Sequence, residues 1–286
     1  MPNFVATAEI QVFLDEDIGS GDITATIIPE SMSAQAQVIT RETMVVCGQA
    51  WFNAVFTALD ANVKIIWQVA EGDRVNADTL LCTLAGNARA LLTGERTALN
   101  LLQTLSATAT IARQYADAVA GTGCKVLDTR KTLPGLRKAQ KYAVACGGCH
   151  NHRMGLYDGV LIKENHIIAA GSITKAVQAA RAHPTAPVEI EVESLQELTE
   201  ALAANPERVM LDNFTVDDLQ TAVALTAGTV ELEASGNINL TNIRRIAETG
   251  VDYISIGALT KNLQAIDLSM RIQLVQEHDD TITRAV

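Results

Sequence analysis

The feature that most constrains this fold is a run of short apolar segments in the second half of the chain. Each is followed by a stretch whose apolar residues recur at helical spacing. The segments occupy residues 124–128, 159–163, 188–193, 208–212, 229–234 and 252–257. The last four start 20, 21 and 23 residues apart, which predicts a repeated strand–helix unit. Right-handed crossovers between parallel strands then build an α/β barrel or an open doubly wound sheet.

Polar residues stand at or near the ends of these predicted strands. Lys163 closes GVLIK and Asp212 closes RVMLD, while Glu189 and Glu191 share one face of VEIEVE. Polar side chains at the carboxyl ends of successive barrel strands are typical of active-site residues. The alternative is a structural ion-pair network in the mouth of the barrel. We favour that alternative for Glu189 and Glu231, because both lie deeper in their strands.

Residues 125–166 form a cationic window in an acidic protein. The chain carries a net charge of −11. The window holds eight Lys and Arg against three Asp and Glu, a balance of +5. Three of the five histidines, His150, His152 and His166, also lie there. Such a local cluster predicts a site for a small, highly charged anion, because a nucleic-acid surface more often spreads its basic charge over a whole domain face.

Two glycine-containing turns follow the last two predicted strands. Ser235, Gly236 and Asn237 form one, and the segment 256–259 contains Gly257 in the other. Backbone N–H groups at such turns can bind a phosphate, and the last two strand–helix loops of a barrel are a common phosphate site.

The first part of the chain predicts a separate domain. Helices are expected at 8–18 and 50–60, strands at 35–47, 62–70 and 79–85, and one long helix at 86–119. We place one domain at 1–115 and the barrel domain at 116–286, with the tail after about residue 270 packing back on the first domain. The pattern EGDRV…LLCTLAG resembles the hairpins of lipoyl and biotinyl carrier domains. No lysine stands between Lys64 and Lys125 to carry the cofactor, so a carrier role is not supported.

Composition narrows the class of protein. Hydrophobic residues make up 48% of the 286 residues, enough for a sizeable core. No apolar run reaches the length of a membrane span. The N-terminus has neither a basic start nor a cleavable apolar region, so we expect a cytoplasmic protein. The five cysteines are then expected to be reduced thiols.

The segment CGGCHNH at 146–152 raises the possibility of a zinc site. Its ligand pairs would be adjacent, whereas structural zinc sites usually separate them by a dozen or more residues. We therefore favour a glycine-rich turn that presents His152 and Arg153 to the site. No GxSxG elbow is present, so a serine hydrolase is not supported.

The window contains two long motifs, DTRKTLPGLRKAQKYAV at 128–144 and NHRMGLYDGVLIKENH at 151–166. Together they closely resemble the quinolinate phosphoribosyltransferase family. Shorter motifs carry the resemblance over nearly the whole chain: EDIGSGDIT (16–24), GERTALN (94–100), EIEVE (189–193), MLDNF (210–214), EASGNI (233–238) and SIGALT (255–260).

The resemblance implies an activity and a fold. It implies phosphoribosyl transfer from 5-phosphoribosyl-1-pyrophosphate to quinolinate, with Mg²⁺, giving nicotinate mononucleotide, pyrophosphate and CO₂ for NAD biosynthesis. It implies an α/β fold, with an N-terminal α/β sandwich domain and an open, TIM-like α/β barrel. It also implies a homodimer with shared active sites. From spacing alone Arg96 reads as a surface residue beside Glu95, but the resemblance assigns it to the site of the partner.

The resemblance further implies roles for individual residues. The carboxylates of quinolinate would be held by Arg96, Arg130, His152, Arg153 and Lys163. Lys131 would meet the charge of the donor, and Glu191 and Asp212 would bind ribose hydroxyls or the Mg²⁺. Ser235, Gly236 and Gly257 would contact the 5-phosphate. Substrate contacts are also expected from Thr129, Asn237, Ile256 and Ala258. The catalytic candidates are Lys163, His152, Glu191 and Asp212.

Two rival functions remain open. One is a paralogue of the same fold that uses another acceptor base, and the other is a non-catalytic anion-binding protein. The NHR…KENH pattern argues against the first, since such paralogues tend to lose it. The complete set of polar positions argues against the second.

Overall fold

The structure is a computed structural model, and it describes residues 7–183 and 185–275. The chain divides into two compact units. Unit 1 comprises the described residues up to Ala107 together with those from Gln264 onward, and unit 2 runs from Thr108 to Leu263. The long helix α3 (Ala88–Ala118) continues through the division, which is why the sequence gives no break there. The boundary proposed from sequence at 115/116 lies further along the same helix.

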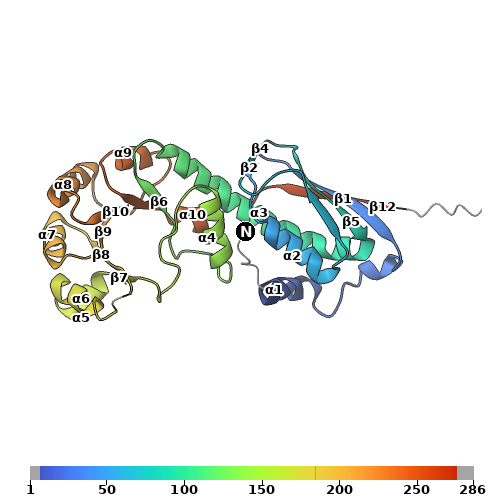
Figure 1. Ribbon diagram of the computed structural model, residues 1–286, viewed down its shortest axis with the longest axis horizontal. Coiled ribbons are helices and arrows are strands. Elements are labelled where there is room, and N and C mark those ends of the chain that lie inside the picture. The colour runs from blue at the N-terminus through green and yellow to red at the C-terminus, as the bar shows by residue number, and fades with distance from the viewer. Residues whose placement is uncertain (1–6, 184, 276–286) are drawn as a thin grey trace, which may run out of the picture. The chain divides into compact units, whose positions relative to one another are not determined.

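Unit 1 contains an antiparallel sheet of four strands in the order β12-β1-β5-β3. The sheet strands are β1 (Ser33–Thr40), β3 (Lys64–Trp67), β5 (Leu80–Asn87) and β12 (Leu268–Val275). The short strands β2 (Met44–Val45) and β4 (Arg74–Val75) pair separately. The helices are α1 (Thr7–Ile18), α2 (Gln49–Leu59), the start of α3 and the 3-10 turn η1 (Ala25–Ile27). The C-terminal strand β12 pairs with β1, so the end of the described chain completes the first sheet (Figure 1).

Buried and exposed residues alternate along β1, and this explains how the sheet packs. Ala34, Ala36 and Val38 are buried, while the residues between them are largely exposed, so one face of the strand meets the core. On β3, the Trp67 ring lies 5.3 Å from the ring of Phe52 on α2. Helix α3 also comes close to α2, because a Cβ atom on Gly94 would lie 2.8 Å from Phe56 Cε1. The glycine of the GERT motif therefore permits a close helix–helix contact.

One strand prediction is wrong. Residues 35–47 do not form a single strand, because β1 ends at Thr40 and β2 begins at Met44. The Thr40 hydroxyl donates to the Glu42 carbonyl at 2.7 Å, which stabilises a turn between the two. Strand β2 then pairs with β4 instead of extending the four-stranded sheet. The remaining helices and strands expected in this half appear within a few residues of their predicted positions.

Unit 2 is a parallel sheet of six strands in the order β6-β11-β10-β9-β8-β7. The strands are β6 (Lys125–Leu127), β7 (Val160–Ile162), β8 (Val188–Val192), β9 (Arg208–Asp212), β10 (Glu231–Ser235) and β11 (Tyr253–Ser255). First and last strands lie side by side, as in a barrel, but β6 and β7 are not paired with each other among the described strands. The predicted strand–helix repeat and the open barrel are thus confirmed (Figure 1).

Helices follow the strands of unit 2. They are α4 (Arg137–Cys146), α5 (Glu164–Ala170), α6 (Ile173–Ala180), α7 (Leu195–Ala204), α8 (Val216–Thr226), α9 (Ile243–Ala247) and α10 (Ala258–Lys261). Ser194 and Thr215 cap α7 and α8 by accepting backbone N–H bonds. One continuous apolar core joins the helices to the sheet. Within the described residues, no helix combines the length and apolar character needed to cross a membrane.

Candidate active site

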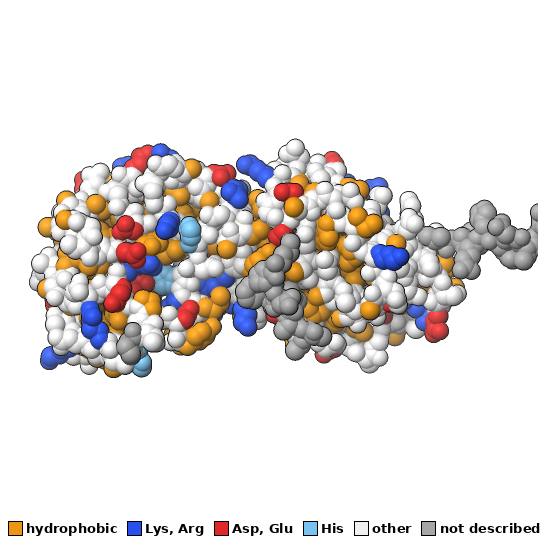
Figure 2. Space-filling view, viewed as in Figure 1, with side chains coloured by type: hydrophobic (Ala, Val, Ile, Leu, Met, Phe, Trp, Pro, Cys, Tyr) orange, Lys and Arg blue, Asp and Glu red, His pale blue; other side chains and the backbone are white. Residues whose placement is uncertain are grey.

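The largest collection of the predicted site residues surrounds a cavity of about 430 Å³ in unit 2. It lies at the carboxyl ends of the parallel strands, and Figure 2 shows charged and histidine side chains gathered around a hollow in this unit. The lining residues are Thr129, Arg130, Lys131, His152, Arg153, Leu161, Lys163, Glu191, Met210, Asp212, Glu233, Ser235 and Ser255. Nine of these thirteen were proposed from sequence.

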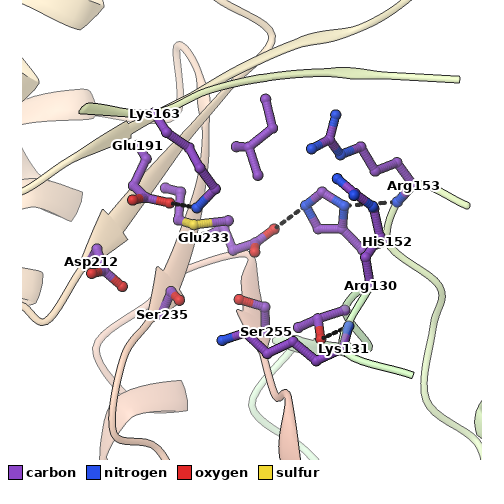
Figure 3. A pocket seen from close by; sticks show the side chains of 13 residues that line it. Arg130, Lys131, His152, Arg153, Lys163, Glu191, Asp212, Glu233, Ser235 and Ser255 are labelled. Atoms are coloured by element: carbon purple, nitrogen blue, oxygen red, sulfur yellow. Dashed lines mark hydrogen bonds and ion pairs between the residues drawn. The ribbon is translucent and has the colours of Figure 1, made fainter. Parts of the chain in front are cut away.

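Arg130, Arg153 and His152 lie on one side of the cavity, and Glu191, Asp212 and Lys163 lie on the other (Figure 3). Arg130, Lys131 and Arg153 come from the loops after β6 and α4. Burial, reinforced by the neighbouring Arg130, lowers the pKa of Arg153. Arg153 donates to the Gly159 carbonyl at 2.9 Å, and Arg130 Nε is buried with no hydrogen-bond partner among the described residues. The cavity therefore presents a concentrated positive charge suited to a dianion.

Lys163 and Glu191 face each other across the strand ends of β7 and β8. Their side chains form an ion pair in which Lys163 is 49% exposed and Glu191 is 15% exposed. Asp212, at the end of β9, accepts a hydrogen bond from Asn213 Nδ2 at 2.6 Å. Both carboxylates offer the hard oxygen ligands that Mg²⁺ prefers. They do not belong to a set of three possible ligands within 4.8 Å of one another among the described residues, so an ion held here would need further oxygens from a substrate.

A buried ion pair fixes the segment that carries His152. Asp128 and Lys141 are both fully buried and form a salt bridge. Asp128 also accepts hydrogen bonds from the His152 backbone N–H at 2.9 Å and from Asn151 Nδ2 at 2.7 Å. Lys141 Nζ donates to the His152 carbonyl at 2.9 Å. Lys141, which counted toward the cationic window, therefore stabilises the core and does not reach the cavity.

The two ring nitrogens of His152 have different surroundings. The Arg153 backbone N–H donates to Nδ1 at 2.7 Å, so the proton of a neutral ring lies on Nε2. Nε2 lies 2.8 Å from Glu189 Oε2 and 3.6 Å from Glu233 Oε2, as ion-pair contacts without hydrogen-bond geometry. Burial opposes a charge on the ring, but the neighbouring Glu189 and Glu233 outweigh it and raise the pKa of His152. The Arg153 amide would have to move before Nδ1 could bind a proton.

Glu233 is a site residue that the sequence did not single out. It is fully buried, and burial together with the nearby Glu189 raises its pKa to about 7. The sequence could have indicated it, because Glu233 stands two residues before Ser235 and therefore lies on the same face of β10. Glu231, further back on that strand, forms an ion pair with Arg208 at 3.1 Å, consistent with the structural role proposed for it. Leu161, Met210 and Ser255 also line the cavity and were not expected.

The glycine turn after β10 is tightly constrained. Gly236 has φ +93°, and a Cβ atom there would lie 2.2 Å from Asn213 Oδ1. Asn237 donates to the same oxygen at 3.2 Å. Gly236 and Asn237 line an adjacent cavity of about 340 Å³ instead of the main one. The next helix, α9, begins only at Ile243, so this turn does not lead directly into a helix as expected.

The second glycine turn lies beside the cationic side of the cavity. Gly257 precedes α10, and a Cβ atom on it would lie 3.2 Å from Lys131 Cδ. Ile256 is buried in the core, and its N–H donates to the Leu127 carbonyl at 2.9 Å. Ala258 packs against the same core. Neither of these two side chains lines the cavity, so backbone groups would have to make the contacts expected of them.

Arg96 is the predicted site residue that unit 2 does not contain. It lies on α3 within unit 1, and its side chain is exposed.

Cys149 and His150 are not placed to bind zinc with the rest of the segment 146–152. Cys149 is buried in the core and its thiol donates to the Ala112 carbonyl at 3.1 Å. Burial raises the pKa of Cys149 to about 12, so the thiolate that zinc requires is disfavoured. Neither Cys149 nor His150 belongs to a set of closely spaced metal ligands among the described residues. All five cysteines are free thiols, as expected.

Known proteins match this chain in sequence and in structure. Two family models match, described as quinolinate phosphoribosyl transferase, N-terminal domain, over residues 22–106, and C-terminal domain, over residues 108–271. A relative from Synechocystis, a probable nicotinate-nucleotide pyrophosphorylase [carboxylating], is 45% identical, with 92% of this chain and 91% of the relative covered.

Further relatives agree with these matches. The nicotinate-nucleotide pyrophosphorylase [carboxylating] of Mycobacterium leprae is 42% identical, covering 90% of this chain and 93% of its own. The solved structure of the nicotinate-nucleotide pyrophosphorylase from Francisella tularensis superposes with a TM-score of 0.91 at 47% identity. That superposition covers 95% of this chain and 98% of the other.

Proposed function

Because this chain belongs to the quinolinate phosphoribosyl transferase family, we propose how its cavity carries out the reaction of that family. The chain is a pentosyltransferase of NAD biosynthesis. It transfers the phosphoribosyl group of 5-phosphoribosyl-1-pyrophosphate to quinolinate, with release of pyrophosphate and CO₂ and formation of nicotinate mononucleotide. The observation that carries the assignment of roles is a single cavity lined by four Lys and Arg side chains and three carboxylates.

The cationic side binds the acceptor. Quinolinate carries two carboxylates, and guanidinium groups bind carboxylates through two parallel hydrogen bonds. Arg130, Arg153 and Lys163 line one cavity and supply three cations to such a dianion. Lys131, beside Gly257, meets the charge of the phosphoribosyl donor. Thr129 supports this arrangement, because its hydroxyl accepts the Lys131 N–H at 3.1 Å.

The carboxylate side binds the donor. Glu191 and Asp212 stand at neighbouring strand ends, where they can accept from ribose hydroxyls. If Mg²⁺ binds here, these carboxylates and the donor's pyrophosphate oxygens would hold it, and it would supply charge stabilisation to the leaving group. Ser235, Gly236 and Gly257 meet the 5-phosphate, with Asn237, Ile256 and Ala258 contributing through the backbone.

Positioning and electrostatics dominate the chemistry. The pyridine nitrogen attacks the anomeric carbon as the bond to pyrophosphate breaks. The nitrogen then carries a positive charge, and loss of CO₂ from the adjacent carbon leaves an electron pair that this charge stabilises. A proton must reach that carbon. Both nitrogens of His152 are engaged within the protein, so Lys163 is the better of the two candidate donors.

The site is shared between two copies of the chain. Arg96 lies on α3 in the GERT motif and is exposed, and the family resemblance assigns it to substrate binding. Arg96→Ala and Lys163→Ala should each be nearly inactive. Refolding them together should restore about a quarter of the activity if dimers form at random, since half of the dimers would hold one intact site. No recovery in confirmed mixed dimers would contradict sharing. The cytoplasmic location likewise stays a prediction.

Pyrophosphate release tests the function. The purified chain is incubated with 5-phosphoribosyl-1-pyrophosphate and Mg²⁺, with quinolinate or nicotinate in parallel. Release with quinolinate alone supports the proposal. Release with nicotinate alone would indicate a paralogue of the same fold, and the roles of Arg96, Arg130 and Arg153 would have to be reassigned. No release with either would favour a non-catalytic anion-binding protein.

A further inference from the structure

A buried charged cluster lies beneath the acceptor side of the cavity. Glu189 on β8, Arg208 on β9 and Glu233 on β10 come from three adjacent strands. Glu189 is 6% exposed and Glu233 is fully buried. Arg208 Nη1 donates to Glu233 Oε2 at 3.3 Å, and its guanidinium lies 4.0 Å from the ring centre of Tyr253. Two carboxylates are therefore held in the interior with one fixed cation.

The cluster meets the cavity at Glu233 and at His152, since both line it. The Nε2 atom of this ring lies 2.8 Å from Glu189 and 3.6 Å from Glu233, and Figure 3 shows the ring turned toward Glu233. The opposite nitrogen accepts the N–H of Arg153 at 2.7 Å. An unbroken chain of contacts thus leads from the two acids, through the ring, to the backbone of a cationic residue that lines the cavity.

Ion pairing alone does not account for the burial of Glu189 and Glu233. Glu189 Oε1 and Glu233 Oε1 are buried with no hydrogen-bond partner among the described residues, which is costly unless function requires it. His152, Glu189 and Glu233 also lie close enough to hold a metal ion together. Arg208 already pairs with Glu233, however, and so places a fixed cation beside the point where an ion would sit. A positioning role accounts for the geometry better.

We propose that Glu189 and Glu233 are positioning residues that act through His152 on Arg153. They hold the ring with Nε2–H turned toward the sheet interior and Nδ1 free to accept the Arg153 amide. That bond fixes the backbone from which the Arg153 guanidinium meets the acceptor. The groups facing the ring from the packed strands are Glu189, Glu233 and Arg208, and all three belong to this arrangement.

The first test uses the unmodified protein and needs no activity. Nitrogen-15 NMR of ¹⁵N-histidine-labelled chain reads the tautomer of each ring, and a His152→Gln sample assigns the signal of His152. At pH 8 we expect one tautomer, with the proton on Nε2 and Nδ1 unprotonated. A mixture of both tautomers, as in an exposed histidine, would overturn the proposal.

The second test is a matched pair of variants on one strand. Glu233→Gln keeps the shape of the side chain and removes its charge. Glu231→Gln does the same to a residue that also contacts Arg208 but does not touch His152. For Glu233→Gln we expect the KM for quinolinate to rise about tenfold, because the charge that lies 3.6 Å from the His152 ring is lost, with a mixed His152 tautomer. The KM for the donor should change little. Glu231→Gln should leave all three quantities near those of the unmodified protein.

Glu189→Gln serves as the second variant, because Glu189 makes the shorter contact. Equal rises in both KM values, or an unchanged His152 tautomer in both variants, would mean that the acids act only on stability and would overturn the proposal. The kinetic arm rests on the proposed function, whereas the tautomer does not. Absence of quinolinate-dependent pyrophosphate release by the unmodified protein would refute the function alone.

Discussion

The buried Asp128–Lys141 pair offers the sharpest test of how this site is supported. Both side chains are fully buried. Lys141→Met removes the ammonium group and leaves the Asp128 carboxylate with only the Asn151 and His152 donors. Breaking a buried pair on one side costs about 3–5 kcal/mol. The two remaining hydrogen bonds place this variant near the lower end, at about 3 kcal/mol.

Asp128→Ala should cost more. It leaves the Lys141 ammonium with the His152 carbonyl alone, strips the His152 N–H of its acceptor, and leaves Asn151 Nδ2 with only the Lys141 carbonyl. Each unpaired buried group adds about 1–3 kcal/mol. We therefore expect a loss of about 5 kcal/mol or more, a large part of the 5–15 kcal/mol that typically stabilises a domain. Combining Asp128→Asn with Lys141→Met removes both charges and should recover at least half of that loss.

Urea unfolding measures these free energies. Both tryptophans, Trp51 and Trp67, lie in unit 1, so their fluorescence follows that unit, while far-ultraviolet circular dichroism follows both units. The loss should appear in the circular dichroism transition. Glu248→Gln is the control, because its ion pair with Arg244 is about half exposed and should be worth less than about 0.5 kcal/mol. A loss below about 1 kcal/mol for Lys141→Met would refute the reasoning, since a fully buried pair cannot be broken so cheaply.

Three further predictions follow from the same structure. Glu233 has a pKa of about 7 in the folded chain, above its ordinary value of 4.5, so the free energy of unfolding falls as pH rises from about 4.5 to 7. In urea unfolding, Glu233→Gln should therefore gain up to about 3 kcal/mol over the unmodified protein between pH 5 and pH 8. A difference that stays constant with pH would contradict this prediction. Lys163→Ala should melt within a few degrees of the unmodified protein, since its ion pair is half exposed, yet lose nearly all pyrophosphate release; a large drop in Tm would instead indicate a structural role. Gly236→Ala should raise the KM for the donor and lower the free energy of unfolding by about 2–3 kcal/mol, because it combines φ +93° with a clash at Asn213. Gly228→Ala, at φ +74° with open space around it, should lower the free energy of unfolding in urea by about 1 kcal/mol. Equal losses in the two variants would mean that the clash does not contribute.

Much of the fold was predictable because it is encoded over short distances. Strand and helix periodicity depends on neighbouring residues, so the six strands of unit 2 appear close to their predicted positions. Parallel strands bring their carboxyl ends to one edge, which predicts that Lys163, Glu191 and Asp212 lie close together, and all three line one cavity. The cationic window likewise predicted an anion site that includes Arg130 and Arg153.

What the sequence could not decide depends on which strands are neighbours. Glu231 and Glu233 share a face of β10 and look equivalent in the sequence, but Glu231 is 50% exposed beside Arg208 whereas Glu233 is buried against His152. Lys141 looks like one more cation of the window until α4 places it beside Asp128. The charge of a side chain follows from the residue type, but its exposure to solvent and its partners depend on packing between segments that are distant in the sequence. The sequence therefore determined the kind of site and the family, and only the tertiary structure decided which charges line the cavity and which are buried in ion pairs.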